Sequence, residues 1–190
     1  MIYNYITSLL MLLANFISFL LLIPISILII KTIYRLINLV KTYKKENLHI
    51  EMLKEGMLTI DDLKDLSPKE FEHWCALFLK KQGFTDVIIS PYDPDGGKDI
   101  VCKRGTETYY VECKRYSKSN FVDVEVARKL VGAMEIDEIK NGIIITTGLL
   151  TEKAIDYIYS LPNPYSITIY DGASLVKEYN NLVSSSLVNA

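Results

Sequence analysis

The sequence has few of the residues that bind zinc or form disulfides. It contains three cysteines, Cys75, Cys102 and Cys113, and two histidines, His49 and His73. The cysteines are odd in number, form no CxxC pair and do not combine with either histidine in a zinc-binding spacing. This pattern argues against a disulfide framework and against a zinc site. It favours reduced, mostly buried cysteines, which suit a cytosolic domain.

Net positive charge is confined to the N-terminal region. The net charge of the chain is −2, but residues 1–45 contain five basic residues and no acidic residue, so the remainder carries −7. Nucleic-acid-binding domains usually show a basic footprint. The acidic balance therefore counts against general nucleic-acid binding by residues 46–190.

No charged residue occurs in the 25 residues from Ile6 to Ile30. A helix needs ~20 apolar residues to cross the bilayer core, so this segment predicts one crossing. The segment lacks the charged start, short apolar core and small-residue cleavage site of a secretory signal peptide, which favours a retained anchor over a cleaved one. A helix buried in a protein core is the other alternative, but the rest of the chain is too small to cover it on all sides.

The basic residues that flank the apolar segment all follow it, so the positive-inside bias places the C-terminal part in the cytoplasm. We therefore expect a single-pass protein of the cell membrane, in which the lysines after the segment meet anionic lipid. The predicted parts are a transmembrane anchor (1–30), a basic juxtamembrane segment and connector (31–66), a globular domain (67–180) and a C-terminal tail (181–190).

A helix start is clearly marked at Ser67, which is followed by Pro68 and, three positions on, by Glu70. This spacing is a capping box with proline in the first turn, and it predicts a helix that ends near Gly83. Glu72 lies at the margin of the apolar stripe of this helix, so its carboxylate should point toward whatever the helix packs on.

Strands and helices alternate along the rest of the chain. The residue patterns predict strands at 86–90, 98–103, 107–114, 142–147 and 166–170, and helices at 122–137, 151–159 and 173–179. This order predicts a three-layer α/β domain with a central mixed sheet.

The turn chemistry at residues 104–107 sets the register of two of these strands. Arg-Gly-Thr-Glu suits a two-residue type II′ hairpin with glycine in the first central position. Paired residue numbers then sum to 211, which places Asp99 directly opposite Glu112. Because strand side chains alternate, Lys114 shares the face of Glu112. Two carboxylates and an amine thus converge, and the repulsion between the carboxylates calls for a cation.

Hard divalent cations such as Mg²⁺ take oxygen ligands, typically one or two carboxylates with water and substrate phosphate. Asp99 and Glu112 meet that requirement as metal ligands. A metal there would activate a bound water and polarise a phosphoryl oxygen, while Lys114 would orient the water or neutralise developing charge. Glu72 would reach a metal-bound water if its helix packs across the same face. The pattern predicts hydrolysis of phosphodiester bonds.

Each of these residues also has a structural interpretation, because a hairpin with one solvated face often carries alternating charges. Asp93 and Asp95 are explained as turn formers, with Asp95 the stronger candidate for a ligand. Arg115, Lys118 and Lys103 are candidates for phosphate contacts, although a solvated loop explains them equally well.

Several motifs occur in the order found in a known family. They are Phe71-Glu72 and the segments 95–100 (DGGKDI), 111–114 (VECK), 142–147 (GIIITT) and 170–172 (YDG). From Ser67 to about Leu175 the chain resembles the Mrr-type catalytic domain of the PD-(D/E)xK nuclease superfamily. The resemblance implies a restriction-endonuclease-like fold, Mg²⁺-dependent DNA cleavage and a role in restricting foreign DNA. It gives the family's catalytic positions to Asp99, Glu112 and Lys114, and the acidic position of its first helix to Glu72.

Two features depart from the family pattern. Many Mrr-like proteins have glutamine in place of Glu112, so the acidic residue here makes the metal site more complete and favours activity. Mrr resembles a two-part protein with a separate DNA-reading domain ahead of the nuclease, whereas here a membrane segment and a short connector take that place. Recognition of modified bases is therefore not supported.

The sequence as a whole predicts a membrane-anchored, Mg²⁺-dependent DNA endonuclease, with Mn²⁺ as an alternative metal. A homodimer is expected because double-strand cutting needs two sites. Two alternatives stay open. One is a catalytically silent nuclease-like module that binds nucleic acid or a partner protein at the membrane, and the other is a nuclease for RNA or branched DNA.

Overall fold

The computed structural model of the chain describes residues 2–52, 57–91, 96–116 and 120–188. It divides into two compact units, Met1–Leu48 and His49–Ala190. Asp93, Asp95 and Lys118, for which the sequence suggested roles in a turn or in phosphate contacts, lie outside the described residues.

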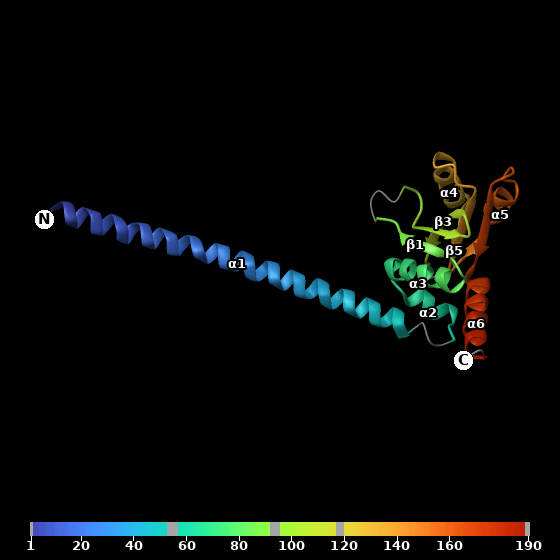
Figure 1. Cartoon of the computed structure of the whole chain (residues 1–190), viewed down its shortest axis with the longest axis horizontal. Coiled ribbons are helices and arrows are strands. Elements are labelled where there is room, and N and C mark those ends of the chain that lie inside the picture. Colours follow the sequence, from blue (N-terminus) through green and yellow to red (C-terminus); the bar gives the residue numbers. More distant parts are fainter. Residues whose placement is uncertain (1, 53–56, 92–95, 117–119, 189–190) are drawn as a thin grey trace. The chain divides into compact units, whose positions relative to one another are not determined.

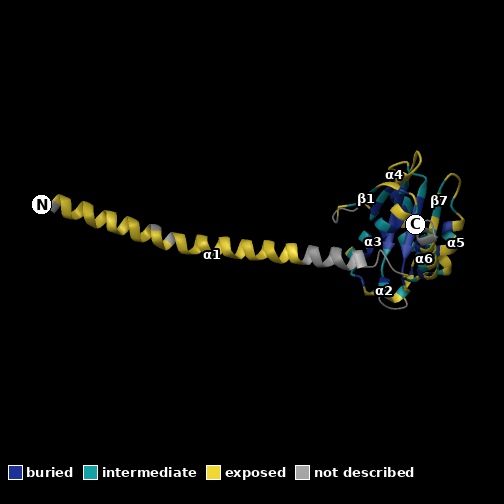
Figure 2. Cartoon of the chain, turned by 60° about the horizontal axis from the view of Figure 1, so that its bottom comes forward, coloured by how far each residue is buried: buried dark blue, intermediate teal, exposed yellow. Residues whose placement is uncertain are grey.

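The first unit is helical. Helix α1 runs from Ile2 to Met52 and contains the apolar segment found in the sequence. Its stretch Tyr3–Lys41 is long and apolar enough to cross a membrane, and none of its most apolar part is buried inside the protein. Figure 2 shows the exposure of this helix, which is unlike that of a core helix in a soluble domain. The membrane position itself rests on length and composition and stays a prediction.

The second unit is built on a five-stranded sheet with the order β1-β2-β3-β5-β7. The strands are β1 (Thr85–Ile89), β2 (Ile100–Arg104), β3 (Glu107–Lys114), β5 (Asn141–Thr146) and β7 (Ser166–Tyr170). β1, β2 and β3 pair antiparallel, whereas β3, β5 and β7 pair parallel. The predicted mixed sheet is therefore confirmed.

Helices cover both faces of this sheet (Figure 1). α2 (Ile60–Asp65), α3 (Pro68–Lys81) and α6 (Gly172–Val188) bury apolar side chains in one core, against one face. α4 (Val124–Ile136) and α5 (Glu152–Tyr159) bury theirs in a second core, against the other face. Along β3, Val111 and Cys113 point into the α3 core and Tyr110 points into the α4 core. The three-layer α/β architecture follows.

Helix α3 begins as its sequence predicts. The Ser67 side chain accepts a hydrogen bond from the Glu70 N–H, and the Glu70 side chain accepts one from the Ser67 N–H, which completes the capping box. Trp74, fully buried in the middle of the helix, stacks on Phe71 and Phe78 with ring centroids 6.2 and 5.6 Å away. These stacked rings fix α3 against its core.

Residues 57–66, assigned to a connector by the sequence analysis, pack into the second unit. Thr59 and Asp62 form a capping box at the start of α2. Leu58, Leu63 and Leu66 are buried in the same core as α3. A six-residue helix is too short to show apolar periodicity, so the sequence indicated only some helical content there.

Two further elements differ from the prediction. The last helix, expected over 173–179, continues to Val188, because Leu175, Tyr179 and Val183 recur every four residues and are all buried. A second, two-stranded parallel sheet joins β4 (Phe121–Val122) to β6 (Leu149–Leu150). Strands of two residues leave no alternating pattern in a sequence.

The packing of α2 predicts the result of shortening one side chain. Leu63→Ala should lower the free energy of unfolding by about 2–5 kcal/mol, because it opens a cavity in a fully buried site. Met57→Ala, at a side chain that is 71% exposed, should change it by less than about 0.5 kcal/mol. The fluorescence of Trp74, the only tryptophan, reports unfolding of either variant by denaturant. Equal stability of the two variants would contradict a core role for α2.

Candidate active site

The hairpin between β2 and β3 has the predicted register. Each pair from Ile100↔Val111 to Arg104↔Glu107 sums to 211. Gly105 has φ +62°, while Thr106 is not among the described residues with positive φ, as a type II′ turn requires. The register argument is therefore confirmed over the length of β2.

Asp99 lies just before β2, where the ladder has ended, so it is not a member of a regular cross-strand pair with Glu112. Its N–H donates to the Val111 carbonyl at 2.8 Å, and its Oδ2 accepts a hydrogen bond from the Cys113 N–H at 2.7 Å. The carboxylate thus takes the place of a backbone carbonyl at the end of the ladder. These two hydrogen bonds hold Asp99 against Val111 and Cys113, the β3 residues on either side of Glu112.

Glu112 is the most unusual residue of the sheet, because its side chain is charged and almost fully buried. Its Oε1 lies 2.6 Å from Lys114 Nζ. Its Oε2 is buried and has no hydrogen-bond partner within the described part of the chain. Burial raises the pKa of the Glu112 carboxyl above its ordinary value, the Asp99 carboxylate raises it further, and Lys114 opposes the rise.

Lys114 is partly exposed at the end of β3. Burial lowers the pKa of its ammonium group, but the Glu112 contact and the Asp99 charge outweigh burial and raise the pKa overall. The Lys114 carbonyl accepts hydrogen bonds from Thr146 Oγ1 at 2.7 Å and from the Thr147 N–H at 3.2 Å. The backbone at this lysine is therefore tied to the end of β5.

Glu72 approaches the same place from α3, although that helix does not pack across the face that Glu112 occupies. α3 covers the opposite face, where Cys113 contacts its core. Burial raises the pKa of the half-buried Glu72 carboxyl, and the Asp99 carboxylate is the next largest cause. The condition set in the sequence analysis for Glu72 is thus not met, and its coupling to the site runs chiefly through Asp99.

The donor set fits a divalent cation held by few protein ligands. Asp99 and Glu112 supply carboxylate oxygens, and Glu112 Oε2 is a buried acceptor that needs a partner. Within the described residues, no group of three or more His, Cys, Asp or Glu side chains is arranged to hold a metal. Two carboxylates of this kind suit a hard divalent cation that completes its coordination with water.

Comparison with known families decides the family of this domain. The sequence model of the Mrr catalytic domain, described as a restriction endonuclease, matches residues 63–179. The chain belongs to the Mrr-type restriction endonuclease family. The match begins within α2, which agrees with the packing of that helix on α3.

One solved restriction endonuclease supports the fold of the Mrr-type domain. The chain is similar to the DNA modification-dependent restriction endonuclease AspBHI, with a TM-score of 0.52 and 15% identity over 77% of this chain and 39% of that one. It also matches MspJI, solved in complex with a 27-mer oligonucleotide, with a TM-score of 0.45 and 17% identity over 63% of this chain and 31% of that one. A protein of unknown function matches with a TM-score of 0.45 and 19% identity, over 62% of this chain and 65% of the other. No curated protein sequence matches the chain.

A polar clamp beside Asp99 was missed by sequence reasoning. Lys98 Nζ lies 3.0 Å from Asp137 Oδ2 and 4.4 Å from the centre of the Tyr110 ring, and the Tyr110 hydroxyl donates to the same Asp137 oxygen at 2.6 Å. Gly97, with φ +85°, leaves room for this approach, because a Cβ there would lie 3.2 Å from Ala133 Cβ. The clamp ties the loop before Asp99 to the end of α4. The consecutive glycines Gly96 and Gly97 were the sequence feature that could have indicated this contact, because glycine allows close approach of the backbone.

The three cysteines of the Mrr-type domain are free and buried, as predicted. Burial raises the pKa of the Cys102 thiol to about 12. Burial also raises the pKa of Cys75, and it raises that of Cys113 well above its ordinary value. None of these thiols is exposed to act as a nucleophile.

We therefore expect the native protein to react poorly with thiol reagents. At pH 8 the raised pKa values leave almost no thiolate, and burial blocks access, so Ellman's reagent should label fewer than one of the three cysteines per chain. Denaturant should expose all three. Rapid labelling of one native cysteine, located by mass spectrometry, would contradict the packing of the strand or helix that carries it.

Proposed function

We propose that this chain is a membrane-anchored, Mg²⁺-dependent DNA endonuclease that hydrolyses phosphodiester bonds. The observation that carries the proposal is the buried Glu112 carboxylate, with one oxygen against Lys114 and the other without a partner in the described part of the chain. A buried acceptor that makes no hydrogen bond is costly. A cation shared with Asp99 would satisfy it, and the restriction endonuclease family supplies the expected chemistry.

Each side chain has a defined part in this proposal. Asp99 and Glu112 would hold the metal through carboxylate oxygens, with Mg²⁺ preferred and Mn²⁺ as an alternative. When bound, such a metal lowers the pKa of a coordinated water and polarises a phosphoryl oxygen. Lys114 would donate a hydrogen bond to the attacking water or to the charge that develops on the phosphate. Glu72, whose pKa is raised, would exchange a proton with water at the outer side of the site.

The cellular setting is part of the same proposal. The apolar stretch of α1 would anchor the protein, and the basic residues after it would keep the C-terminal domain in the cytoplasm. A nuclease held there would meet foreign DNA as it enters the cell, which is consistent with restriction. Cutting both strands would require two sites, so we expect a homodimer during cleavage.

The proposal predicts cleavage that depends on three residues. The full chain in detergent, and a fragment beginning at Met57, should nick or linearise plasmid DNA with Mg²⁺ or Mn²⁺. Asp99→Ala, Glu112→Gln and Lys114→Ala should each lower the rate by about 100-fold or more, because the first two remove a proposed metal ligand and the third removes positive charge beside the reacting phosphate. Agarose gels of timed digests measure the loss.

A matched control comes from α4. Glu125 is an exposed carboxylate paired with Arg128 at 2.6 Å, so Glu125→Gln removes an acidic group without touching the site. Its cleavage rate should equal that of the wild type. Intact plasmid with both metals, on methylated and unmethylated DNA alike, would refute the simple form of the proposal.

The rival is a catalytically silent module that binds nucleic acid or a partner protein at the membrane, and the acidic balance of residues 46–190 favours its protein-binding form. Titration calorimetry separates the two, because such a module has no need of a metal. We expect Mg²⁺ and Ca²⁺ to bind the wild type and Glu112→Gln to abolish binding. Because the pKa of Glu112 is raised, protons should compete with the metal, so affinity should fall as the pH is lowered toward that raised pKa.

Membrane placement has its own prediction. The full chain should stay in the membrane pellet after alkaline carbonate washing, and a chain lacking residues 1–45 should move to the supernatant, because only the former has the apolar helix. A tag at the C-terminus should resist protease added outside spheroplasts and become sensitive after lysis. Cleavage of the tag in intact spheroplasts would reverse the proposed orientation.

A further inference from the structure

A cavity of about 300 Å³ opens beside the proposed active site. Its walls come from α2, from the two short strands β4 and β6, and from the start of α6. Among the residues that the structure describes, the side chains that line it are largely apolar, and Lys64 is the one charged residue. A cavity of this size is at the lower end of small-molecule sites.

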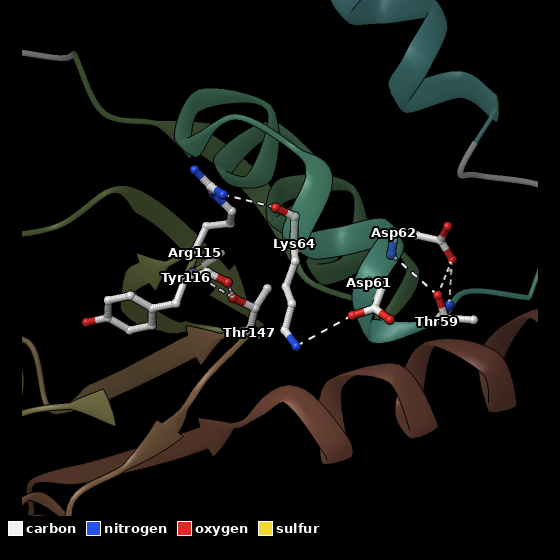
Figure 3. Close-up of polar contacts among 7 residues, drawn as sticks. All are labelled: Thr59, Asp61, Asp62, Lys64, Arg115, Tyr116 and Thr147. Atoms are coloured by element: carbon white, nitrogen blue, oxygen red, sulfur yellow. Dashed lines mark hydrogen bonds and ion pairs between the residues drawn. The ribbon is translucent and has the colours of Figure 1, made fainter. Parts of the chain in front are cut away.

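One wall residue of the cavity, Thr147, is hydrogen-bonded to the end of the proposed catalytic strand, and Figure 3 shows its contacts with Tyr116. Thr147, in its wall, donates its N–H to the Lys114 carbonyl at 3.2 Å. The Thr147 hydroxyl accepts a hydrogen bond from the Tyr116 N–H at 2.7 Å and donates to the Tyr116 carbonyl at 3.1 Å. The cavity therefore begins within a few residues of Lys114 along the same sheet edge.

Two large apolar side chains stand at this cavity with much of their surface in solvent. Phe121 is 55% exposed and Leu149 is 52% exposed. They are partners in the β4–β6 register, and their neighbours Val122 and Leu150 are buried and anchor the pair. An aromatic ring held in this way is a stacking surface, and stacking of one base on such a ring is worth about 1–3 kcal/mol.

Positive charge borders the same cavity. Lys64 lines it and carries a loose ion pair with Asp61 at 3.6 Å. Arg115, next to Lys114 in sequence, donates from Nη1 to the Lys64 carbonyl at 2.9 Å, so its guanidinium lies at the end of α2 (Figure 3). A ligand that combines flat apolar rings with negative charge matches this surface, and a nucleotide of a DNA strand has both.

We propose that the cavity receives one unpaired base of the DNA strand bound at the proposed active site. The base stacks on Phe121, and the Lys64 ammonium lies beside the phosphate of the same nucleotide. This inference rests on the proposed function for its choice of nucleic acid as the ligand. It adds a preference for DNA in which a base near the cleaved bond is unpaired or easily unstacked.

The test uses the full chain in detergent with Ca²⁺, which supports binding without cleavage, and two labelled duplexes. One duplex is fully paired and the other carries a single unpaired 2-aminopurine. Phe121→Ala should weaken binding of the unpaired-base duplex about 5- to 150-fold, the equivalent of one stacked base. Phe121→Trp should keep the affinity. The 2-aminopurine fluorescence should change on binding to the wild type and not to Phe121→Ala.

Two further variants separate stacking and charge from folding. Ile136→Ala removes an apolar side chain that is 84% exposed on α4, away from the cavity lining, and should bind both duplexes as the wild type does. Lys64→Met should reduce the slope of log affinity against log salt by about one, as the loss of one phosphate contact requires. Trp74 fluorescence during denaturation checks that each variant is folded.

The outcomes distinguish this inference from the proposed function. Equal binding of the unpaired-base duplex by Phe121→Ala and wild type overturns the base site, whether or not the protein cuts DNA. A shift in sedimentation of Phe121→Ala with unchanged DNA affinity also overturns it and makes the cavity a contact between protein copies. If the wild type binds the unpaired-base duplex but never cuts DNA, and Phe121→Ala loses that binding, the base site is supported while the nuclease proposal fails. A wild type that binds no DNA overturns both.

Discussion

The burial of the Glu112 carboxylate is the constraint on which the rest of the site depends. A charged group in the interior of a sheet is tolerated only when it is paired and hydrogen-bonded. Lys114 supplies one partner, at 2.6 Å from Oε1, but Oε2 has none in the part of the chain that the structure describes. The arrangement is therefore incomplete as a purely structural ion pair. Replacing both residues by apolar ones would be the simpler way to stabilise the fold, so their presence points to a role outside stability.

The surrounding architecture holds this incomplete pair rigidly. β3 is the central strand of the sheet, antiparallel to β2 on one side and parallel to β5 on the other. The ladder to β2 stops one residue short of Asp99, and this early end frees the Asp99 carboxylate to bond the Cys113 N–H. On the other side, Thr146 and Thr147 hold the Lys114 carbonyl. The proposed functional side chains thus lie where the regular β2–β3 pairing ends, on a backbone that the neighbouring strands hold in place.

Short sequence patterns were sufficient to predict the elements that carry the proposed site. The glycine turn at 105 fixed the hairpin register, and the capping box at Ser67 fixed the start of α3. The departure of Asp99 from the ladder was not predictable, because it depends on a side-chain bond to a strand fourteen residues away. The Lys98–Asp137 clamp joins residues 39 positions apart, and no local pattern reports such a contact. The two-residue strands β4 and β6 and the six-residue helix α2 escaped for a different reason, since each is too short to repeat the period that identifies its type.

Local charge also resolves the apparent conflict between an acidic domain and the proposed DNA substrate. The net charge of −7 on residues 46–190 is a sum over the whole surface, whereas salt screens exposed charges beyond about 8 Å at physiological ionic strength. At the proposed site, a strand of DNA would meet the Lys114 ammonium together with three carboxylates, those of Glu72, Asp99 and Glu112. The carboxylates repel phosphate until a divalent cation neutralises them. Affinity for DNA should therefore depend on the metal more than on the protein's net charge, and the same negative groups that oppose nonspecific binding become the means of productive binding.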